Sequence, residues 1–364
     1  MDEGRLGLHL REKTLLRRDF LIGGALAAGL ESSGKVCIAA AQARDETRRP
    51  VDALSLKASR KFYNFATLDV FTSERFGGNQ LAVFPNAVGL SAEQMTRITR
   101  EFNYSEASFV FPPSDPRNTA KVRIFEGHGE IPFAGHPNVG TAFLLGTIAS
   151  AFGRPIGDAL TFEELGGLVS AELLRTSTGV VGARIKAPQR LQIRTKLDPE
   201  LLAACVSLPR SDIVDANGFP VMASAGLPFA LVEVSSVDAL AKAKPDHAAF
   251  RRADALHRQS EVSFSVLMFA RGGASPVALR TRMFAPLDGI EEESVTGSAS
   301  AALGAYLTTI APRRNADVHW SLTQGVEMGR ASKIEVSVKI SAGEIERVEV
   351  GGSCKLVTRG QLYV

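Results

Sequence analysis

The sequence predicts an α+β protein made of two similar halves, each a sheet curled around one central buried helix. Three observations predict this fold. Short motifs recur in the same order at an offset of about 155 to 161 residues, which indicates an internal duplication. The segments 137–152 and 297–311 are predicted helices without a charged side chain, which is typical of helices buried on every face. Short strand-like segments surround both helices.

The first half is predicted to begin at Lys61 with two strands joined by a Gly-rich turn. A helix follows over residues 91–102, because Ser91 and Gln94 have the spacing of a capping box and apolar residues recur along one face. The other strand-like segments of both halves are 106–111, 121–125, 182–186, 229–234, 262–270, 278–284 and 334–339.

Three short matches relate the two halves. The segment SEASF over 105–109 corresponds to SEVSF over 260–264, and RIF over 123–125 corresponds to RMF over 282–284. The turns GHPNVGTAFLLG and TGSASAALGAYL then open the two apolar helices. Each match is short, but order and offset agree across all three, so duplication is favoured over chance. We expect a first domain over 61–178, to which a C-terminal strand over 355–364 returns, and a second domain over 179–354.

The first 60 residues differ from the rest. Arg17 and Arg18 precede the short apolar run IGGALAAGL, and the small residues of 41–43 offer a cleavage site. This pattern resembles a twin-arginine export signal over 1–43, followed by a polar linker over 44–60, and predicts a periplasmic protein. The apolar run is too short for stable membrane insertion. The alternatives are a small N-terminal helix or a mis-assigned start codon, with a cytoplasmic location.

Composition excludes several classes of function. Forty-two basic and 39 acidic residues give a net charge of +3, and no basic block alternates with aromatic residues, so nucleic-acid binding is not supported. Cys37, Cys205 and Cys354 form no CxxC pair, and the six histidines form no pair at metal-ligand spacing. We therefore predict no metal site.

The starts of the two apolar helices are the candidate site. A helix N-terminus carries unpaired N–H groups and a partial positive charge, so it binds anions. Two such ends facing one cleft would hold a carboxylate, and Gly135 and Gly297 would let the backbone approach it closely. The same turns bring the polar side chains of His136, Thr296 and Ser298.

Two carboxyl groups lie near these turns in the sequence. Glu106 begins a strand after a helix, where partial desolvation would raise its pKa towards values useful for proton transfer. Glu293 directly precedes the second turn. Each feature also has a plain interpretation: His136 as a capping or packing residue, Glu106 as an exposed strand end, and 291–293 as a solvated loop. Because these features lie near the helix starts of two similar halves, together they favour a functional site.

Six segments resemble the PhzF-type phenazine-biosynthesis family in the same order, from about Phe62 to the C-terminus: DVFTSERFGGNQLAVF, NYSEASFVF, RIFEGHGEIPFAGHPNVGTAFLL, GLPFALVEV, RMFAPLDGIEEESVTGSASAALGAYL and QGVEMGRASKIEV. The resemblance implies a diaminopimelate epimerase-like fold, with two barrel-like, mostly antiparallel sheets around central helices and the site in the cleft. It also implies isomerisation of a small carboxylate such as trans-2,3-dihydro-3-hydroxyanthranilate without a cofactor or metal, and a homodimer.

The resemblance implies roles for particular residues. Glu106 is the expected acid/base, supported by His136 and Ser298, and Glu293 stands where the family usually has Asp. Substrate-binding positions are Asn79, Gly135, Thr296 and Gly297.

The chain also departs from the family motifs. Ser294, Gln80 and Ala331 each stand where the family commonly has Pro, and Glu126–Gly127 replaces a frequent Thr-Pro. These departures leave the fold intact and the identity of the substrate open.

Three functional hypotheses follow. The first is a cofactor-independent isomerase that moves a proton through Glu106. The second is a non-catalytic exported binding protein for an acidic metabolite. The third is a two-thiol epimerase or racemase, which needs Cys at both helix starts. The third hypothesis is rejected, because Gly135 and Thr296 occupy those positions.

Overall fold

The computed structural model describes residues 61–258, 262–272, 275–311 and 314–364. The predicted export signal over 1–43, the linker over 44–60, Cys37 and the first two residues of the second SExSF motif lie outside this part. No helix within it is long and apolar enough to cross a membrane.

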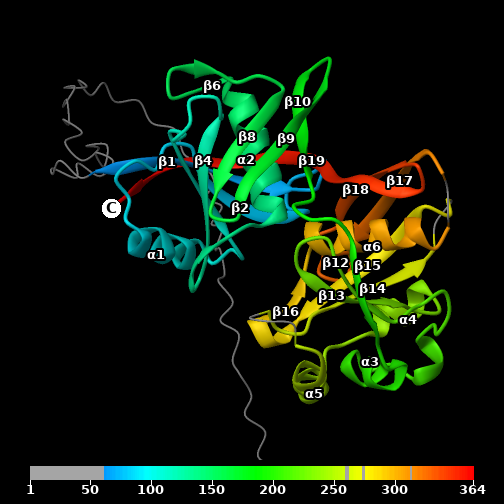
Figure 1. Cartoon of the computed structure of the whole chain (residues 1–364). Coiled ribbons are helices and arrows are strands. Elements are labelled where there is room, and N and C mark those ends of the chain that lie inside the picture. The colour runs from blue at the N-terminus through cyan, green and yellow to red at the C-terminus, as the bar shows by residue number, and fades with distance from the viewer. Residues whose placement is uncertain (1–60, 259–261, 273–274, 312–313) are drawn as a thin grey trace, which may run out of the picture. The chain divides into compact units, whose positions relative to one another are not determined.

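The first half is a closed barrel around helix α2 (Gly135–Ile148), with its strands seen in blue to green in Figure 1 except β19, which is red. Hydrogen-bonded neighbours follow the order β1, β2, β3, β4, β8, β9, β10 and β19, and β19 pairs with β1 again. The strands are β1 (Phe62–Val70), β2 (Asn79–Phe84), β3 (Ala107–Phe111), β4 (Ala120–Glu126), β8 (Ala159–Glu164), β9 (Gly167–Thr176), β10 (Gly179–Lys186) and β19 (Glu344–Tyr363). Three short strands, β5 (Gly129–Ile131), β6 (Ser150–Ala151) and β7 (Arg154–Pro155), complete this half.

The second half repeats the same topology around helix α6 (Gly297–Thr309). In each half, an antiparallel pair is followed by a parallel, an antiparallel and another parallel pairing, then by an antiparallel hairpin. The strands are β11 (Gln192–Lys196), β12 (Val221–Ser224), β13 (Pro228–Glu233), β14 (Val266–Arg271), β15 (Ala278–Ala285), β16 (Ile290–Glu293), β17 (Ala316–Gln324) and β18 (Ser332–Ser341). This agreement supports the predicted duplication and confirms the predicted α+β fold.

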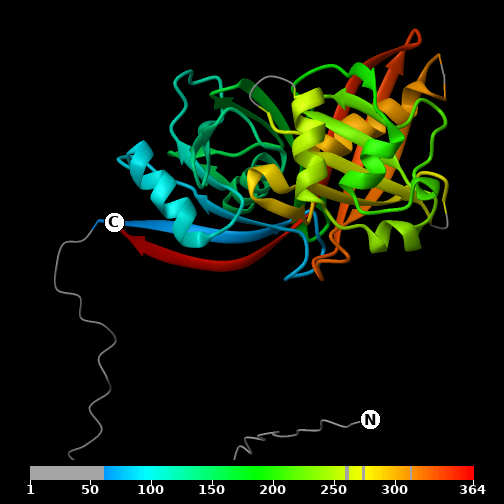
Figure 2. The ribbon, with the colours of Figure 1, turned by 90° about the horizontal axis from the view of Figure 1, so that it is seen from below.

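In the described residues, four further α-helices lie outside the two curled sheets: α1 (Ala92–Phe102), α3 (Pro199–Cys205), α4 (Val237–Lys242) and α5 (His247–His257). The capping box predicted for α1 is present, because Ser91 accepts a hydrogen bond from the Gln94 N–H and the Gln94 side chain accepts one from Ser91 N–H. Each helix covers an outer face of its half, while α2 and α6 fill the interiors (Figure 2).

The long strand β19 joins the halves. Its first part pairs with β18, its middle with β10 and its last part, from Cys354 to Tyr363, with β1. The segment 355–364, expected to return to the first half, includes the part of β19 that pairs with β1. The expected start of the second domain at residue 179 differs from the strand pairing, because β10 forms a hairpin with β9 and packs on α2. The turn between 176 and 179 is a hairpin turn, and the first half extends to Lys186.

The two central helices are buried because neither offers a polar face. In α2 every residue from His136 to Gly146 is buried, and in α6 all but Ser298 and Thr309 are buried. Small residues let the sheet approach closely: a Cβ on Gly146 would lie 2.4 Å from Leu173 Cδ1 of β9. Helix α2 ends earlier than predicted, at Ile148, because Ala149 takes a left-handed conformation (φ 59°) and leads into β6.

Truncating a side chain in this core should lower the free energy of unfolding far more than the same change on an outer helix. We expect Leu303→Ala in α6, where Leu303 is fully buried, to lower the free energy of unfolding by about 2–5 kcal/mol, since it leaves a cavity. Leu256→Ala on α5 is the matched control, because Leu256 is 71% exposed. Chemical denaturation measures both changes, and equal losses would contradict the central position of α6.

Candidate active site

The N-termini of α2 and α6 meet between the two halves. A Cβ added at Gly135 would lie 3.5 Å from the Gly297 Cα, which is ordinary van der Waals contact. The helix contact therefore does not itself require glycine at these positions. Neither helix has a side-chain cap or an acidic residue in its first turn. The first N–H groups and the positive ends of both helix dipoles thus remain available for a ligand.

A cavity of about 460 Å³ lies at these helix starts and is walled by both halves. Its apolar walls include Ile131, Phe133, Leu227, Phe229 and Met283. Its polar lining consists of Glu106, Glu126, His136, Ser263, Ser265, Asp288, Glu293, Thr296 and Ser298. A mostly apolar hollow with a few convergent polar groups is the usual form of a small-molecule site.

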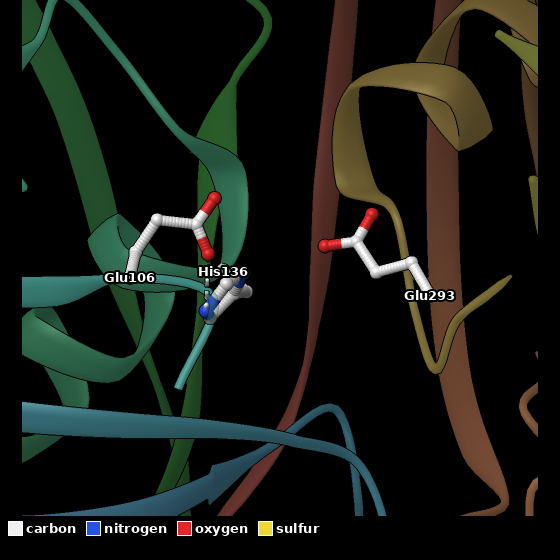
Figure 3. Close-up of side chains that lie close together, drawn as sticks. All are labelled: Glu106, His136 and Glu293. Atoms are coloured by element: carbon white, nitrogen blue, oxygen red, sulfur yellow. Dashed lines mark ion pairs between the residues drawn. The ribbon is translucent and has the colours of Figure 1, made fainter. Parts of the chain in front are cut away.

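Glu106 and His136 face each other in this cavity. Glu106 directly precedes β3, and His136 is the second residue of α2. The His136 Nε2 atom lies 3.5 Å from Glu106 Oε2, the contact drawn as a dashed line in Figure 3. Both atoms are buried and have no hydrogen-bond partner among the described residues. Burial lowers the pKa of His136, and the negative charge of Glu106 opposes this shift, so the imidazole is neutral at neutral pH.

Glu293 lies across from this pair, at the end of β16. Its Oε1 accepts a hydrogen bond from Asn79 Nδ2 at 3.2 Å, and its Oε2 accepts one from Thr296 Oγ1 at 2.5 Å. Burial raises the pKa of Glu293 to about 8, and the nearby charge of Glu106 adds to this shift. The hydrogen bonds from Thr296 and Asn79 act in the opposite direction. Glu293 therefore keeps its proton at neutral pH.

The structure brings seven of the eight predicted site residues to the cavity wall: Glu106, Gly135, His136, Glu293, Thr296, Gly297 and Ser298. Asn79 is the exception. It is 7% exposed and lies behind the wall, where its Nδ2 is 3.3 Å from His136 Nδ1 and also contacts Glu293. The amide links the two halves of the site. If this amide N–H₂ donates to Nδ1, the His136 proton lies on Nε2, facing Glu106.

Three residues at the site are not identified by the sequence patterns. Glu126 and Asp288 line the cavity, although Glu126 drew notice only as a departure from a family motif. The Gln324 side chain is fully buried, and its Nε2 donates to the Glu293 carbonyl oxygen at 2.8 Å. Gln324 lies at the end of β17 and begins the family-like segment QGVEMGRASKIEV. No local pattern indicates that it contacts Glu293, 31 positions away.

The cysteines of the described part lie elsewhere. Cys205 and Cys354 are both buried and neither lines the cavity. Burial raises the pKa of each thiol to about 12, which makes them poor acids and bases near neutrality.

Glu106, His136 and Glu293 have the composition of a possible metal site. One ligand atom from each lies within 4.8 Å of the others, and two carboxylates with one imidazole suit several divalent ions. Sequence spacing could not reveal this set, because its members lie 30 and 157 residues apart.

Known proteins match this chain along nearly all of its described residues. Residues 68–360 match the family model for phenazine biosynthesis-like proteins, PhzC-PhzF. An uncharacterized isomerase of Mesorhizobium japonicum is 34% identical over 83% of this chain and 99% of its own length. The trans-2,3-dihydro-3-hydroxyanthranilate isomerase of Pseudomonas fluorescens is 33% identical over 83% of this chain and its entire own length.

Solved structures agree on the fold. A PhzF-family protein of Bacillus anthracis superposes with a TM-score of 0.72 at 22% identity, covering 84% of this chain and all of its own. A predicted epimerase of Pseudomonas aeruginosa gives a TM-score of 0.66 at 28% identity, covering 83% of this chain and 99% of its own.

The half-buried Glu293 carboxyl should make stability depend on pH. Its pKa is higher in the folded than in the unfolded protein, so the folded state binds more protons between about pH 4.5 and 8 and loses stability as pH rises through this range. We expect Glu293→Gln to remove a slope of at most about 1.4 kcal/mol per pH unit. Denaturation at pH 5 and 8 measures it, with the exposed Glu101→Gln on α1 as control. Parallel wild-type and E293Q profiles would refute the raised pKa.

Proposed function

The chain belongs to the PhzC-PhzF family of phenazine biosynthesis-like proteins and is an isomerase of this type, and on that premise we propose that Glu106 is its acid/base. The main observation that supports this proposal is the position of the Glu106–His136 pair, which lies in one cavity with two uncapped helix N-termini. The substrate is a small molecule with a carboxylate, similar to that named for the Pseudomonas fluorescens relative.

Glu106 removes a proton from a carbon next to an unsaturated group. The C–H electron pair enters the π system, the double bond shifts, and a second carbon takes back a proton from Glu106. The positive ends of α2 and α6 stabilise the negative charge that develops on the substrate. No other reactant is needed, because the product is an isomer of the substrate.

His136 and Glu293 support this transfer in different ways. Neutral His136 directs Nε2–H towards Glu106 Oε2 and so helps to position the carboxyl group that moves the proton. Glu293 keeps a proton at neutral pH, so it can donate a hydrogen bond to the substrate from the side opposite Glu106. Ser298, half-buried in the first turn of α6, is positioned to contact the carboxylate.

We further propose that the protein is exported by the twin-arginine route and acts as a homodimer. The arginine pair at 17–18 and the small residues at 41–43 support export. Exposed apolar side chains support self-association, among them Leu165 and Leu168, each 68% exposed beside one hairpin turn.

Expression of the full chain in a bacterium with and without twin-arginine transport tests both points. We expect a product shortened by about 43 residues in the periplasm of the competent strain, with twice the monomer mass in sedimentation. Cytoplasmic retention in both strains would exclude export, and a monomeric mass would exclude the dimer.

Replacing Glu106 should stop catalysis without unfolding the protein. We expect Glu106→Gln to lower solvent-deuterium incorporation into trans-2,3-dihydro-3-hydroxyanthranilate, or into the best substrate of a small amino-carboxylate panel, by about 10²–10⁴-fold. Proton magnetic resonance in D₂O measures the exchange. Glu101→Gln, the same change on the exposed face of α1, should keep full activity. Exchange at the wild-type rate in E106Q would exclude Glu106 as the base.

A further inference from the structure

The same ion pair occurs in both halves, close to the site. Arg282 of β15 donates from Nε to Glu292 Oε1 at 2.8 Å and from Nη2 to Glu292 Oε2 at 2.7 Å. Arg123 of β4 contacts Glu130 of β5 in the same way, from Nε to Oε1 at 2.9 Å and from Nη2 to Oε2. Two parallel hydrogen bonds between a planar guanidinium and a carboxylate fix the orientation of both groups. Each half therefore has an arginine clamp, Arg123–Glu130 or Arg282–Glu292.

The two clamps also share their surroundings. Arg123 and Arg282 are the first residues of the repeated motifs RIF and RMF. The Arg123 guanidinium lies 5.1 Å from the centre of the Phe125 ring, and that of Arg282 lies 4.9 Å from the centre of the Phe284 ring. Both are distances of a cation–π contact. The clamp therefore belongs to the duplicated unit and is not a feature of one surface.

Arg282 is anchored on its other side as well. Its side chain is 8% exposed, and its Nη1 donates to the carbonyl oxygens of Leu240 at 2.9 Å, Ala241 at 3.2 Å and Ala243 at 2.9 Å. These carbonyls lie at the C-terminal end of α4, where carbonyl groups lack partners within the helix. Arg282 thus connects an outer helix of the second half to β16.

This connection acts on the strand that carries Glu293. Strand β16 pairs with β15 at two positions, with an irregular register between them. Neighbouring residues of a strand point to opposite faces, and here Glu292 contacts Arg282 while Glu293 lines the cavity. Holding the Glu292 carboxylate at two points therefore also fixes the direction of the Glu293 side chain.

The first-half clamp lies at the start of the opposite cavity wall. Glu130 belongs to the short strand β5, which ends at Ile131. The next residues of the chain, 131–136, all line the cavity and lead into the N-terminus of α2. The Arg123–Glu130 contact thus holds the strand from which this wall and His136 extend.

We propose that Arg123 and Arg282 are positioning residues of the isomerase, each fixing through its clamp the segment that leads into one helix start, 131–136 or 293–298. The inference rests on the proposed function for the roles of His136 and Glu293. Neither arginine lines the cavity, so both act through neighbouring residues. When a clamp is broken, its short strand shifts, and a displacement of about 1 Å near the reacting groups costs about 10²-fold in rate.

Glu292→Gln and Arg282→Lys test the second-half clamp. Each variant keeps a polar side chain and loses the two-point contact. With trans-2,3-dihydro-3-hydroxyanthranilate, the substrate named for the Pseudomonas fluorescens relative, we expect kcat for solvent-deuterium incorporation to fall about 10–100-fold. KM should change by less than about threefold. The double variant should lose about as much as the more impaired single variant, because the two residues act as one pair.

Arg271→Lys is the matched control. Arg271 of β14 pairs with Glu233 and lies over the Phe269 ring, but none of these three residues lines the cavity. This variant breaks the same kind of contact and should keep the wild-type kcat and KM. The unfolding midpoint of each variant verifies that it is folded.

Amide hydrogen exchange of the unliganded full protein tests the positioning without a substrate. We expect Glu292→Gln to speed exchange over 293–298, and Glu130→Gln to speed it over 131–136, each by at least about tenfold. Each change should leave the segment of the other half unaffected, and Arg271→Lys should leave both unaffected.

Three outcomes overturn the proposal: a wild-type kcat in E292Q, losses that multiply in the double variant, or amide exchange that is unchanged or rises equally along the chain. Glu106→Gln separates this proposal from the catalytic one, since it should stop proton transfer and leave amide exchange of both segments unchanged. If E106Q keeps activity, or if the wild type does not turn over the tested compound, the amide exchange alone decides whether the clamps position the site.

Discussion

The structure depends on the burial of two helices that carry no charged side chain, because such helices need apolar contacts on every face. The curled sheets supply these contacts around the length of α2 and α6. The sheets cannot satisfy the helix ends, where N–H groups remain without intrahelical partners. Both N-termini open on the same cavity, so the polar groups that the fold leaves unpaired are gathered where a ligand can reach them.

That arrangement explains the electrostatics of the site. Partial desolvation pushes the proton affinities of His136 and Glu293 in opposite directions, which leaves the imidazole neutral and the carboxyl protonated at neutral pH. Glu106 then faces the neutral His136, and the N-termini of α2 and α6 open on the same cavity. If Glu106 is the acid/base, as proposed, a proton can move through it without either neighbour competing for it.

The two halves share one topology, but the site that they form is asymmetric. His136 and Ser298 occupy the same second helical position of α2 and α6, yet the imidazole belongs to a buried pair while the hydroxyl lines the open wall. Asn79 links the two halves, because its side chain contacts His136 of the first half and Glu293 of the second. The cavity therefore requires both halves, although each half has its own sheet and central helix.

The sequence alone determined what depends on neighbouring residues: the capping box of α1, the charge-free central helices and the repeat of motifs. Roles for Glu106, His136 and Glu293 in one site were implied only by the resemblance to family motifs. Tertiary structure decided what depends on strand adjacency. The pairing of β10 with β9 assigned it to the first half, Asn79 came to lie behind the cavity wall, and Gln324, Glu126 and Asp288 were brought to the site from distant strands. Local periodicity reports which face of an element is apolar, but contacts between remote strand ends are fixed only when the sheets close around their helices.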